Sequence, residues 1–557
     1  MNPFAIAVVA VLLVSVRAAE PRVQGRSLVI SRTGIVATEQ VLASQVGARI
    51  LAEGGTAADA AVAANAMMGL VSPGMCGIGG DMFCIVYEAK TGKVYGLNAN
   101  GWSPEKLTVE FLRGKGHATM PTNGIHSVTV PGTVHGWEQL LKRFGKMKMR
   151  EVLKPAIQLA EEGFPVTEWV QDYWGGKITL AKLRATTNAA KTFLPGGNAP
   201  RVGQIFRNPD LAWSYRQIAK RGAKAFYDGA IAERIVAYSD SLGGTLTRDD
   251  LRKFESKWTV PISTTYRGWR VYEIPPPGQG IAALAMLNIM ERFPMADYPH
   301  NSADALHTMI EAKKLAYADM LKNVADPDFA KIPTREMLSK NHAAARAKLV
   351  GAEANCAVEA SITFDAGPET TYLCVVDKDG NMVSYIQSNF YAFGTGLVPD
   401  GCGFALQNRG GLFTLEAGHP NMLAGRKRPL HTIIPALMEK DDVRIAFGIM
   451  GGWNQSQAHA QFVSKVVDAQ LNIQAALESP RFTKLTFEGC DVKVESRIAP
   501  EVIAELEKRG HKVEVIEPYA SDVGGGQAVM RDFSTGVNYG ASDPRKDGAA
   551  VPEWNDQ

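Results

Sequence analysis

The hydrophobic positions near the start of the chain recur with helical spacing and then give way to strand-like runs. Residues 40–51 carry apolar side chains one turn apart and stop at a glycine pair. Residues 57–68 predict an alanine-rich second helix with Thr56 as its N-cap. Apolar runs at 82–87 and 94–98 predict two strands. This alternation predicts helices layered on sheets.

Helical periodicity dominates the middle of the chain, from about residue 135 to residue 330. A proline run at 275–277 interrupts it and leads rigidly into the next helix. Between about residues 345 and 368 the periodicity fades and glycine and acidic residues appear, which indicates a loop. The helices predicted most clearly span residues 135–143, 150–162, 212–221, 281–291 and 303–321.

A β-hairpin follows this loop. Residues 370–376 form an apolar, β-branched run, residues 377–380 have turn chemistry, and a second apolar run begins at 382–386. Thr370 opens the first strand, so its hydroxyl is expected at the mouth of a central strand. By itself this position says little, because threonine is favoured in strands.

Composition places the chain among soluble globular proteins with a sizeable core. Hydrophobic residues make up 46% and charged residues 21% of the 557 residues. The 60 Lys and Arg against 57 Asp and Glu leave a net charge of +3. This excess is too small to indicate a nucleic-acid partner.

The N-terminus reads as a secretory signal. Residues 4–16 are an apolar run, and small residues then predict cleavage after about Ala18. The run is too short for a good membrane span, so an uncleaved anchor is the weaker alternative, and no other stretch is long enough. The predicted location is therefore secreted or periplasmic.

The six cysteines are scattered without a C-x-x-C pair, which excludes a zinc cluster of that type. Most lie in apolar runs, so buried free thiols are expected and any disulfide would be incidental. The G-x-S-x-G, G-x-x-x-x-G-K-[ST], complete G-x-G-x-x-G and H-E-x-x-H signatures are absent. We expect neither a metal nor a cofactor.

Several separate blocks together resemble the γ-glutamyltranspeptidase family, in the same order and at similar spacing. The similarity covers about residues 34–540 and includes both halves of the chain. The blocks that carry it are the hairpin at Thr370, residues 54–63, 77–80, 130–132, 136–137, 393–396 and 426–430, and the pair Gly451–Gly452.

This resemblance implies a four-layer αββα N-terminal nucleophile hydrolase that cuts its own chain between Glu369 and Thr370. After a signal peptide at 1–18, residues 19–369 would form the large subunit and residues 370–557 the small catalytic subunit, in one composite domain. The cut gives Thr370 a free α-amine. Because an α-amine titrates near pKa ~8, it can serve as general base for its own hydroxyl.

The resemblance also implies roles for other residues. Ser388 matches a family threonine that hydrogen-bonds the nucleophile. Gly451 and Gly452 match the glycines whose N–H groups stabilise the oxyanion. His431 and Thr432 stand where the family usually has two serines near the substrate, and His431 could either contact substrate or simply pack.

The two positions expected to bind the α-carboxylate and the α-amine of a γ-glutamyl substrate depart from the family pattern. Asn100 stands in place of the arginine that pairs with the substrate α-carboxylate, and Leu412 in place of the aspartate that takes the α-amine. Asn cannot supply the charge of an arginine–carboxylate pair. Arg409 could compensate by binding a carboxylate from another direction.

The resulting prediction is a self-processing γ-glutamyltransferase or glutathione hydrolase-like enzyme. It would transfer the acyl group of a small-molecule amide, through a Thr acyl-enzyme, to water or an amino acid. One alternative is an amidase or acylase of the same fold for another acyl group. A second is an unprocessed, inactive extracellular binding protein, which would remain a single chain.

Overall fold

The computed structural model describes residues 24–364 and 369–554. The predicted signal peptide at residues 1–18 lies outside these ranges. Within them, no helix combines the length and the apolar character that crossing a membrane requires.

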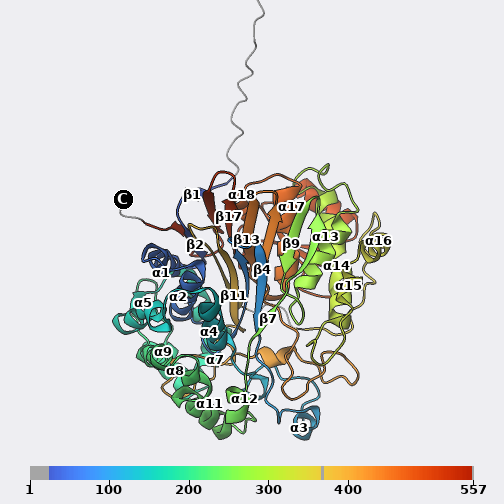
Figure 1. The fold of residues 1–557 in the computed structure, drawn as a ribbon. Helices are drawn as coiled ribbons and strands as arrows, with labels where there is room; N and C mark the ends of the chain where they lie inside the picture. Colours follow the sequence, from blue (N-terminus) through green and yellow to red (C-terminus); the bar gives the residue numbers. More distant parts are fainter. Residues whose placement is uncertain (1–23, 365–368, 555–557) are drawn as a thin grey trace, which may run out of the picture.

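Two seven-stranded sheets form the centre of the protein (Figure 1). The first has the order β1 (Val29–Ser31), β18 (Val537–Ser542), β17 (Gly526–Asp532), β13 (Val443–Ile449), β12 (Ala436–Lys440), β9 (Trp269–Glu273), β8 (Ile262–Tyr266). The second has the order β19 (Ala549–Pro552), β2 (Ile35–Thr38), β10 (Glu369–Val376), β11 (Met382–Phe390), β3 (Asp81–Glu88), β4 (Lys93–Ala99), β7 (Lys257–Thr259). All pairings within both sheets are antiparallel.

Helices cover the outer face of each sheet, as Figure 1 shows on its left and right sides. The layer on the second sheet includes α1 (Val41–Ala52), α2 (Ala57–Val71), α4 (Thr133–Phe144), α5 (Met149–Glu162) and α9 (Pro209–Arg221). Shorter helices extend it: α6 (Glu168–Gly175), α7 (Lys177–Arg184), α8 (Thr187–Phe193), α10 (Lys224–Tyr227), α11 (Ala230–Ser241) and α12 (Arg248–Arg252). The layer on the first sheet includes α13 (Gly280–Met290), α14 (Ala303–Asn323), α16 (Lys340–Ala347), α17 (Gln455–Val467), α18 (Ile473–Glu478) and α19 (Pro500–Lys508).

Strand β10 shows how the sequence produces these layers. Its side chains alternate between two apolar cores, as the period of two in a strand requires. Tyr372 and Cys374 join the core between the two sheets. Leu373 and Val375 join the core under the helices. The four-layer αββα arrangement predicted from the family resemblance is therefore confirmed.

The predicted helices are present, with shifts of a few residues at their ends. Helix α2 begins as expected: the Thr56 hydroxyl accepts from Asp59 N, and the Asp59 carboxylate accepts from Thr56 N in return. All residues of α2 are buried, and its alanines allow close packing against the sheet and the neighbouring helices. Local capping and a small-residue surface were both readable from sequence.

The region predicted as mostly helical contains α4 to α14, and it also contains β7, β8 and β9, which complete the edges of both sheets. One expectation needs correction. Cys356 and Cys490 form a disulfide, with Cα atoms 5.1 Å apart, where we expected free thiols. The other four cysteines are buried and free, as expected.

Candidate active site

Thr370 lies at the mouth of β10, at an irregularity in the sheet. The register with β11 shifts between Glu369 and Thr371, so Thr370 alone faces Ser388 and Asn389 across a β-bulge. Thr370 is only 1% exposed, and its Oγ1 has no hydrogen-bond partner among the described residues. A buried hydroxyl without a partner costs free energy, which makes Thr370 a candidate for a functional role.

The glycine turn after β13 lies at the same end of the sandwich. The Ser384 hydroxyl donates to the Phe447 carbonyl at 3.4 Å. One step further, Tyr372 packs so closely on Gly448 that a Cβ there would meet its ring at 2.4 Å. The second contact is closer than the first both to Thr370 in the hairpin and to the glycine turn after β13. Thr370 and the turn therefore lie at the same end of the two sheets.

The turn itself requires glycine. Gly451 has φ of +112° and Gly452 φ of +58°, both in the left-handed region that strains other residues. The Gly452 carbonyl accepts from Gln279 Nε2 at 2.7 Å. Neither glycine N–H makes a backbone hydrogen bond to another residue of the described chain. Two N–H groups at the end of a rigid strand have the character of an oxyanion site.

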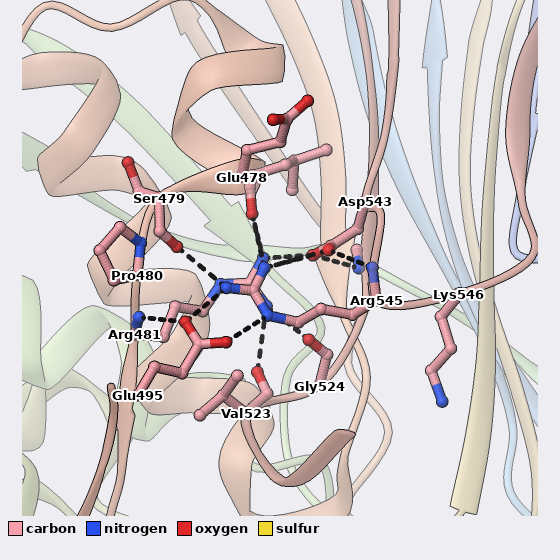
Figure 2. Close-up of polar contacts among 12 residues, drawn as sticks. Glu478, Ser479, Pro480, Arg481, Glu495, Val523, Gly524, Asp543, Arg545 and Lys546 are labelled. Carbon is pink, nitrogen blue, oxygen red and sulfur yellow. Dashed lines mark hydrogen bonds and ion pairs between the residues drawn. The ribbon is translucent and has the colours of Figure 1, made fainter. Parts of the chain in front are cut away.

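A buried ion network centred on Arg481 and Arg545 lies beside the segment that the turn contacts (Figure 2). The Met450 N–H donates to the Gly525 carbonyl at 3.0 Å, which joins the turn to the segment before β17. Arg481 holds that segment, because its Nη1 donates to the Val523 carbonyl at 3.1 Å. The network therefore contacts residues 523–524, and the neighbouring Gly525 bonds to Met450, the residue before the two glycines.

The same network keeps its charges at neutral pH. Arg545 binds Glu495 at 2.6 Å and Asp543 at 3.0 Å, and Arg481 also pairs with Asp543. Burial alone would raise the pKa of Asp543, but the charges of Arg481 and Arg545 outweigh it and hold the pKa below its ordinary value. The turn thus rests on a permanently ionised, fully buried support.

Asp81 is a buried residue of the site that the sequence analysis missed. It is the first residue of β3 and pairs directly with Ser388 of β11. Its Oδ1 accepts from Gln407 Nε2 at 2.8 Å and from Gly132 N at 3.1 Å, and its Oδ2 lies 3.2 Å from His431 Nε2. An acidic residue directly after a glycine cluster, at the start of a buried strand, was the available signal.

The hydrogen bonds of His431 define which ring nitrogen carries its proton. Its Nδ1 accepts from Ile433 N at 3.2 Å, so the ring proton lies on Nε2 and is donated to Asp81. Burial, and then the charge of Arg409, lower the pKa of His431 well below its ordinary value. His431 is therefore neutral at physiological pH and acts as a fixed donor to the carboxyl group.

Arg409 links two hydroxyls of the site. Its Nη1 donates to Thr432 Oγ1 at 2.6 Å and its Nη2 to Ser388 Oγ at 2.9 Å. The guanidinium also lies 4.4 Å from the centre of the Phe390 ring. Burial lowers the pKa of Arg409 to about 9, against the opposing effect of Asp81, so the cation persists at neutral pH. Its charge polarises both hydroxyls and makes them stronger hydrogen-bond donors.

The two departures from the family pattern offer no charge. Asn100 is fully buried and donates from Nδ2 to the Pro429 carbonyl at 3.0 Å. Leu412 is 1% exposed and belongs to the same apolar core as Phe390 and Leu430. Neither residue replaces the ionic partner that an amino acid head group needs.

Gln279 is a second residue that the sequence analysis missed. It follows the proline run and caps α13, and its Nε2 donates both to the Gly452 carbonyl and to the Thr432 carbonyl. One side chain therefore ties the glycine turn to the residue that receives Arg409. The proline run marked a rigid entry into a helix, but nothing local indicated this contact.

A cavity of about 450 Å³ is lined by the residues on either side of Leu412. One wall includes Gly411 and Phe413, and another includes Ile362 and Phe364, from the segment that precedes the predicted cut. This volume accommodates a small organic molecule.

The comparisons with known proteins agree with this geometry. The family model described as Gamma-glutamyltranspeptidase matches residues 43–553. The chain belongs to the γ-glutamyltranspeptidase family. It shares the αββα fold of the N-terminal nucleophile hydrolases, and it is an enzyme of that class by descent.

Three relatives show the range of this family. The glutathione hydrolase-like YwrD proenzyme of Bacillus subtilis is 37% identical, over 94% of this chain and 99% of the relative. The oxamate amidohydrolase proenzyme of Klebsiella pneumoniae is 33% identical, over the same shares of each chain. The crystal structure of cephalosporin acylase from Bacillus halodurans has a TM-score of 0.89 and 40% identity, over 96% of this chain and 98% of that one.

One group of described side chains has metal-ligand chemistry away from these residues. Ligand atoms of His307, Glu311 and His511 lie within 4.8 Å of one another. Glu311 is already paired with Lys314 at 2.6 Å. Burial, and then the charge of Lys314, lower the pKa of His511 to about 3. The positive surroundings disfavour a cation, and we assign this group no role in the family's chemistry.

The oxyanion role of the glycine turn gives a testable prediction. Gly452→Ala should reduce turnover by at least about a hundredfold, because strain at positive φ displaces an N–H donor from the reacting oxygen. Steady-state kinetics on purified enzyme measures this. Gly92→Ala is the matched control, since Gly92 also has positive φ but lies in open space. Parental turnover in Gly452→Ala would rule out the assignment.

Asp81 gives a pH-dependent prediction. Burial raises its pKa from 3.8 to about 7, although the charge of Arg409 opposes this. Because the folded-state pKa is raised, the stability from protonated Asp81 is complete below about pH 4 and is lost as pH rises through 7. Asp81→Asn should therefore gain about 2–3 kcal/mol relative to the wild type between pH 5 and pH 8.

Thermal unfolding at both pH values measures this change. Asp249→Asn is the control, because Asp249 is exposed and its pKa is lowered to about 2, far below the window tested. If the Asp81→Asn and wild-type midpoints move in parallel from pH 5 to pH 8, then Asp81 does not titrate in this range.

Proposed function

We propose that the chain is a self-processing amide hydrolase that forms an acyl-enzyme on Thr370. The observation that carries this is the buried Thr370 hydroxyl, which has no hydrogen-bond partner within residues 24–364 and 369–554. It lies at a strand mouth, next to Ser388 and at the same end of the sandwich as the glycine turn. Processing would divide the chain into residues 19–369 and 370–557. Export is part of the proposal, and the Cys356–Cys490 disulfide supports it.

Self-cleavage would begin with attack of Thr370 Oγ1 on the Glu369 carbonyl carbon. The peptide C–N bond breaks as the ester forms, and the nitrogen takes up the proton that the hydroxyl loses. Water then hydrolyses the ester. This step restores the hydroxyl and leaves Thr370 with a free α-amine.

Turnover would use that amine as the base. It accepts the hydroxyl proton while Oγ1 attacks the amide carbonyl of the donor, and the glycine N–H groups stabilise the resulting oxyanion. The protonated amine then gives its proton to the leaving amine, and the acyl ester remains on Thr370. Water, or an amino acid, attacks the ester and releases the acyl group.

The acyl group best matched to the site carries a terminal carboxylate and no α-amine. Arg409 supplies positive charge through the hydroxyls of Ser388 and Thr432. Leu412 offers nothing to an ammonium group. The oxamate amidohydrolase relative is named for a substrate of this kind, a small amide with a carboxylate.

Transfer of a γ-glutamyl group is the second candidate, favoured by the family and by the glutathione hydrolase-like relative. The test is a panel of donors offered to processed enzyme: glutathione, a γ-glutamyl anilide, a glutaryl amide and oxamate, with and without a dipeptide acceptor. Release of amine or ammonia from at least one donor is expected. No turnover of any donor, by a protein that remains one chain, would instead support an inactive binding protein.

A further inference from the structure

The disulfide joins parts of the chain on opposite sides of the predicted cut. Cys356 and Cys490 are 134 residues apart, and the bond between Glu369 and Thr370 lies between them. Cys356 is exposed, whereas Cys490 is buried, at the residue before β15 (Asp491–Glu495). If the chain is cut as proposed, one cysteine belongs to each product.

The segment around Cys356 already lies against the other side of the cut. Ala354 N donates to the Arg509 carbonyl at 2.7 Å, and Ala360 N donates to Glu488 Oε1 at 3.2 Å. These two hydrogen bonds flank the disulfide in sequence. The segment therefore follows the small-subunit surface on both sides of Cys356.

Further along, the segment reaches the residue that follows the glycine turn. The Phe364 ring is stacked on Trp453, with ring centres 5.2 Å apart and an angle of 18° between the planes. It also contacts Phe487 edge-on at 6.3 Å. Together with Ile362, Phe364 forms a wall of the 450 Å³ cavity. A cut chain that lost this segment would lose that wall.

We propose that the Cys356–Cys490 disulfide is an interchain bond of the mature enzyme and holds residues 354–364 of the large chain as a wall of the cavity. This rests on the proposed cut at Thr370. Beside the disulfide, two hydrogen bonds and the packing of Ile362 and Phe364 hold the segment on the small chain, so we expect loss of the disulfide to increase its exchange with solvent. With the disulfide in place, rebinding of the segment to the small chain is intramolecular, at an effective concentration of about the millimolar range.

The Cys356–Cys490 disulfide forms by a two-electron oxidation of the two thiols. The two thiols lose two protons and two electrons, and the S–S bond forms. The acceptor is a disulfide of the oxidoreductase class, which leaves as a dithiol after a mixed-disulfide intermediate. A soluble dithiol reverses the reaction, and the exposed Cys356 gives it access.

The first test is electrophoresis of processed protein that is denatured in excess alkylating agent, so that the buried free thiols are blocked as they become exposed. We expect one species of about 60 kDa without reductant, close to the full chain's 60.2 kDa less its signal peptide, and two chains with reductant. Cys356→Ser and Cys490→Ser should each give two chains under both conditions. Cys402→Ala, which changes a buried free thiol, should behave as the wild type.

The outcomes separate the link from the processing on which it depends. Two chains without reductant in the wild type would overturn the interchain bond and leave the proposed cut intact. One chain with reductant would refute the cut itself, and with it the link. Mass spectrometry of a peptide pair containing Cys356 and Cys490 identifies the bond directly.

The second test measures what the retained segment does. Cys356→Ser should raise KM for a donor that fills the cavity by about fivefold or more, with kcat within about twofold of the wild type. Dithiol treatment should produce the same change in the wild type and none in the variant. An unchanged KM in both experiments would show that the segment forms no part of the binding cavity.

Discussion

Thr370→Ala is expected to yield a single uncut chain with no measurable turnover. The variant lacks the oxygen that attacks the Glu369 carbonyl, so neither the cut nor the acyl-enzyme can form. Loss of a nucleophile typically lowers turnover by about a million-fold. Reducing electrophoresis, followed by N-terminal sequencing of the small chain, measures the outcome. In the wild type that chain should begin at Thr370.

The neighbouring residue provides a matched control. Thr371 is also buried, and its hydroxyl likewise has no partner among the residues that the structure describes. Thr371→Ala should process at the same bond as the wild type. Thr370→Ser should still process, because it keeps a hydroxyl, but more slowly than the wild type. Normal cleavage of Thr370→Ala at this bond would show that its Oγ1 is not the attacking group.

Glutathione is expected to be a poor substrate of the processed enzyme. Its γ-glutamyl group carries an α-carboxylate and an α-amine, and the positions that should hold them are Asn100 and Leu412. Each charge-assisted hydrogen bond contributes roughly 1.5–3 kcal/mol. We therefore expect kcat/KM for glutathione to be lower by at least about a thousandfold than for a donor with a terminal carboxylate and no α-amine.

Arg409→Gln tests the origin of this preference. It should raise KM for the carboxylate donor by roughly 10- to 100-fold, because the charge behind Ser388 and Thr432 is lost. Assays at pH 6 avoid a stability artefact, since Asp81 is then largely protonated and needs no cationic partner. Arg49→Gln is the control, because Arg49 is exposed, pairs with Glu53 at 2.7 Å and does not line the cavity.

Ordinary glutathione turnover in the wild type would contradict this placement, and so would an Arg409→Gln enzyme with unchanged KM for every donor. The γ-glutamyl function would then stand without modification. A fall in thermal stability at pH 6 would indicate that Arg409 acts mainly through folding. The double variant Asp81→Asn/Arg409→Gln, measured at pH 8 where Asp81 is largely ionised, separates that effect by removing both buried charges together.

Features that depend on local interactions could be predicted from the amino-acid sequence alone. The hairpin at residues 370–386 was readable because strand alternation and turn chemistry act over a few residues. Helix α2 was readable because its cap, Thr56, bonds a residue three positions later. The resemblance of short motifs to a family proposed Thr370, Ser388 and the glycine turn as candidate site residues without any knowledge of contacts.

Contacts between residues far apart in the sequence became known only from the folded structure. The short strands between residues 257 and 273 carry a weak pattern of their own, and β9 is defined by its pairing with β12, far along the chain. Asp81 meets Gln407 across 326 residues, and Cys356 meets Cys490 across 134. Burial and long-range pairing set the pKa of Asp81 and the connectivity of the cysteines, and neither is encoded in a local run of residues.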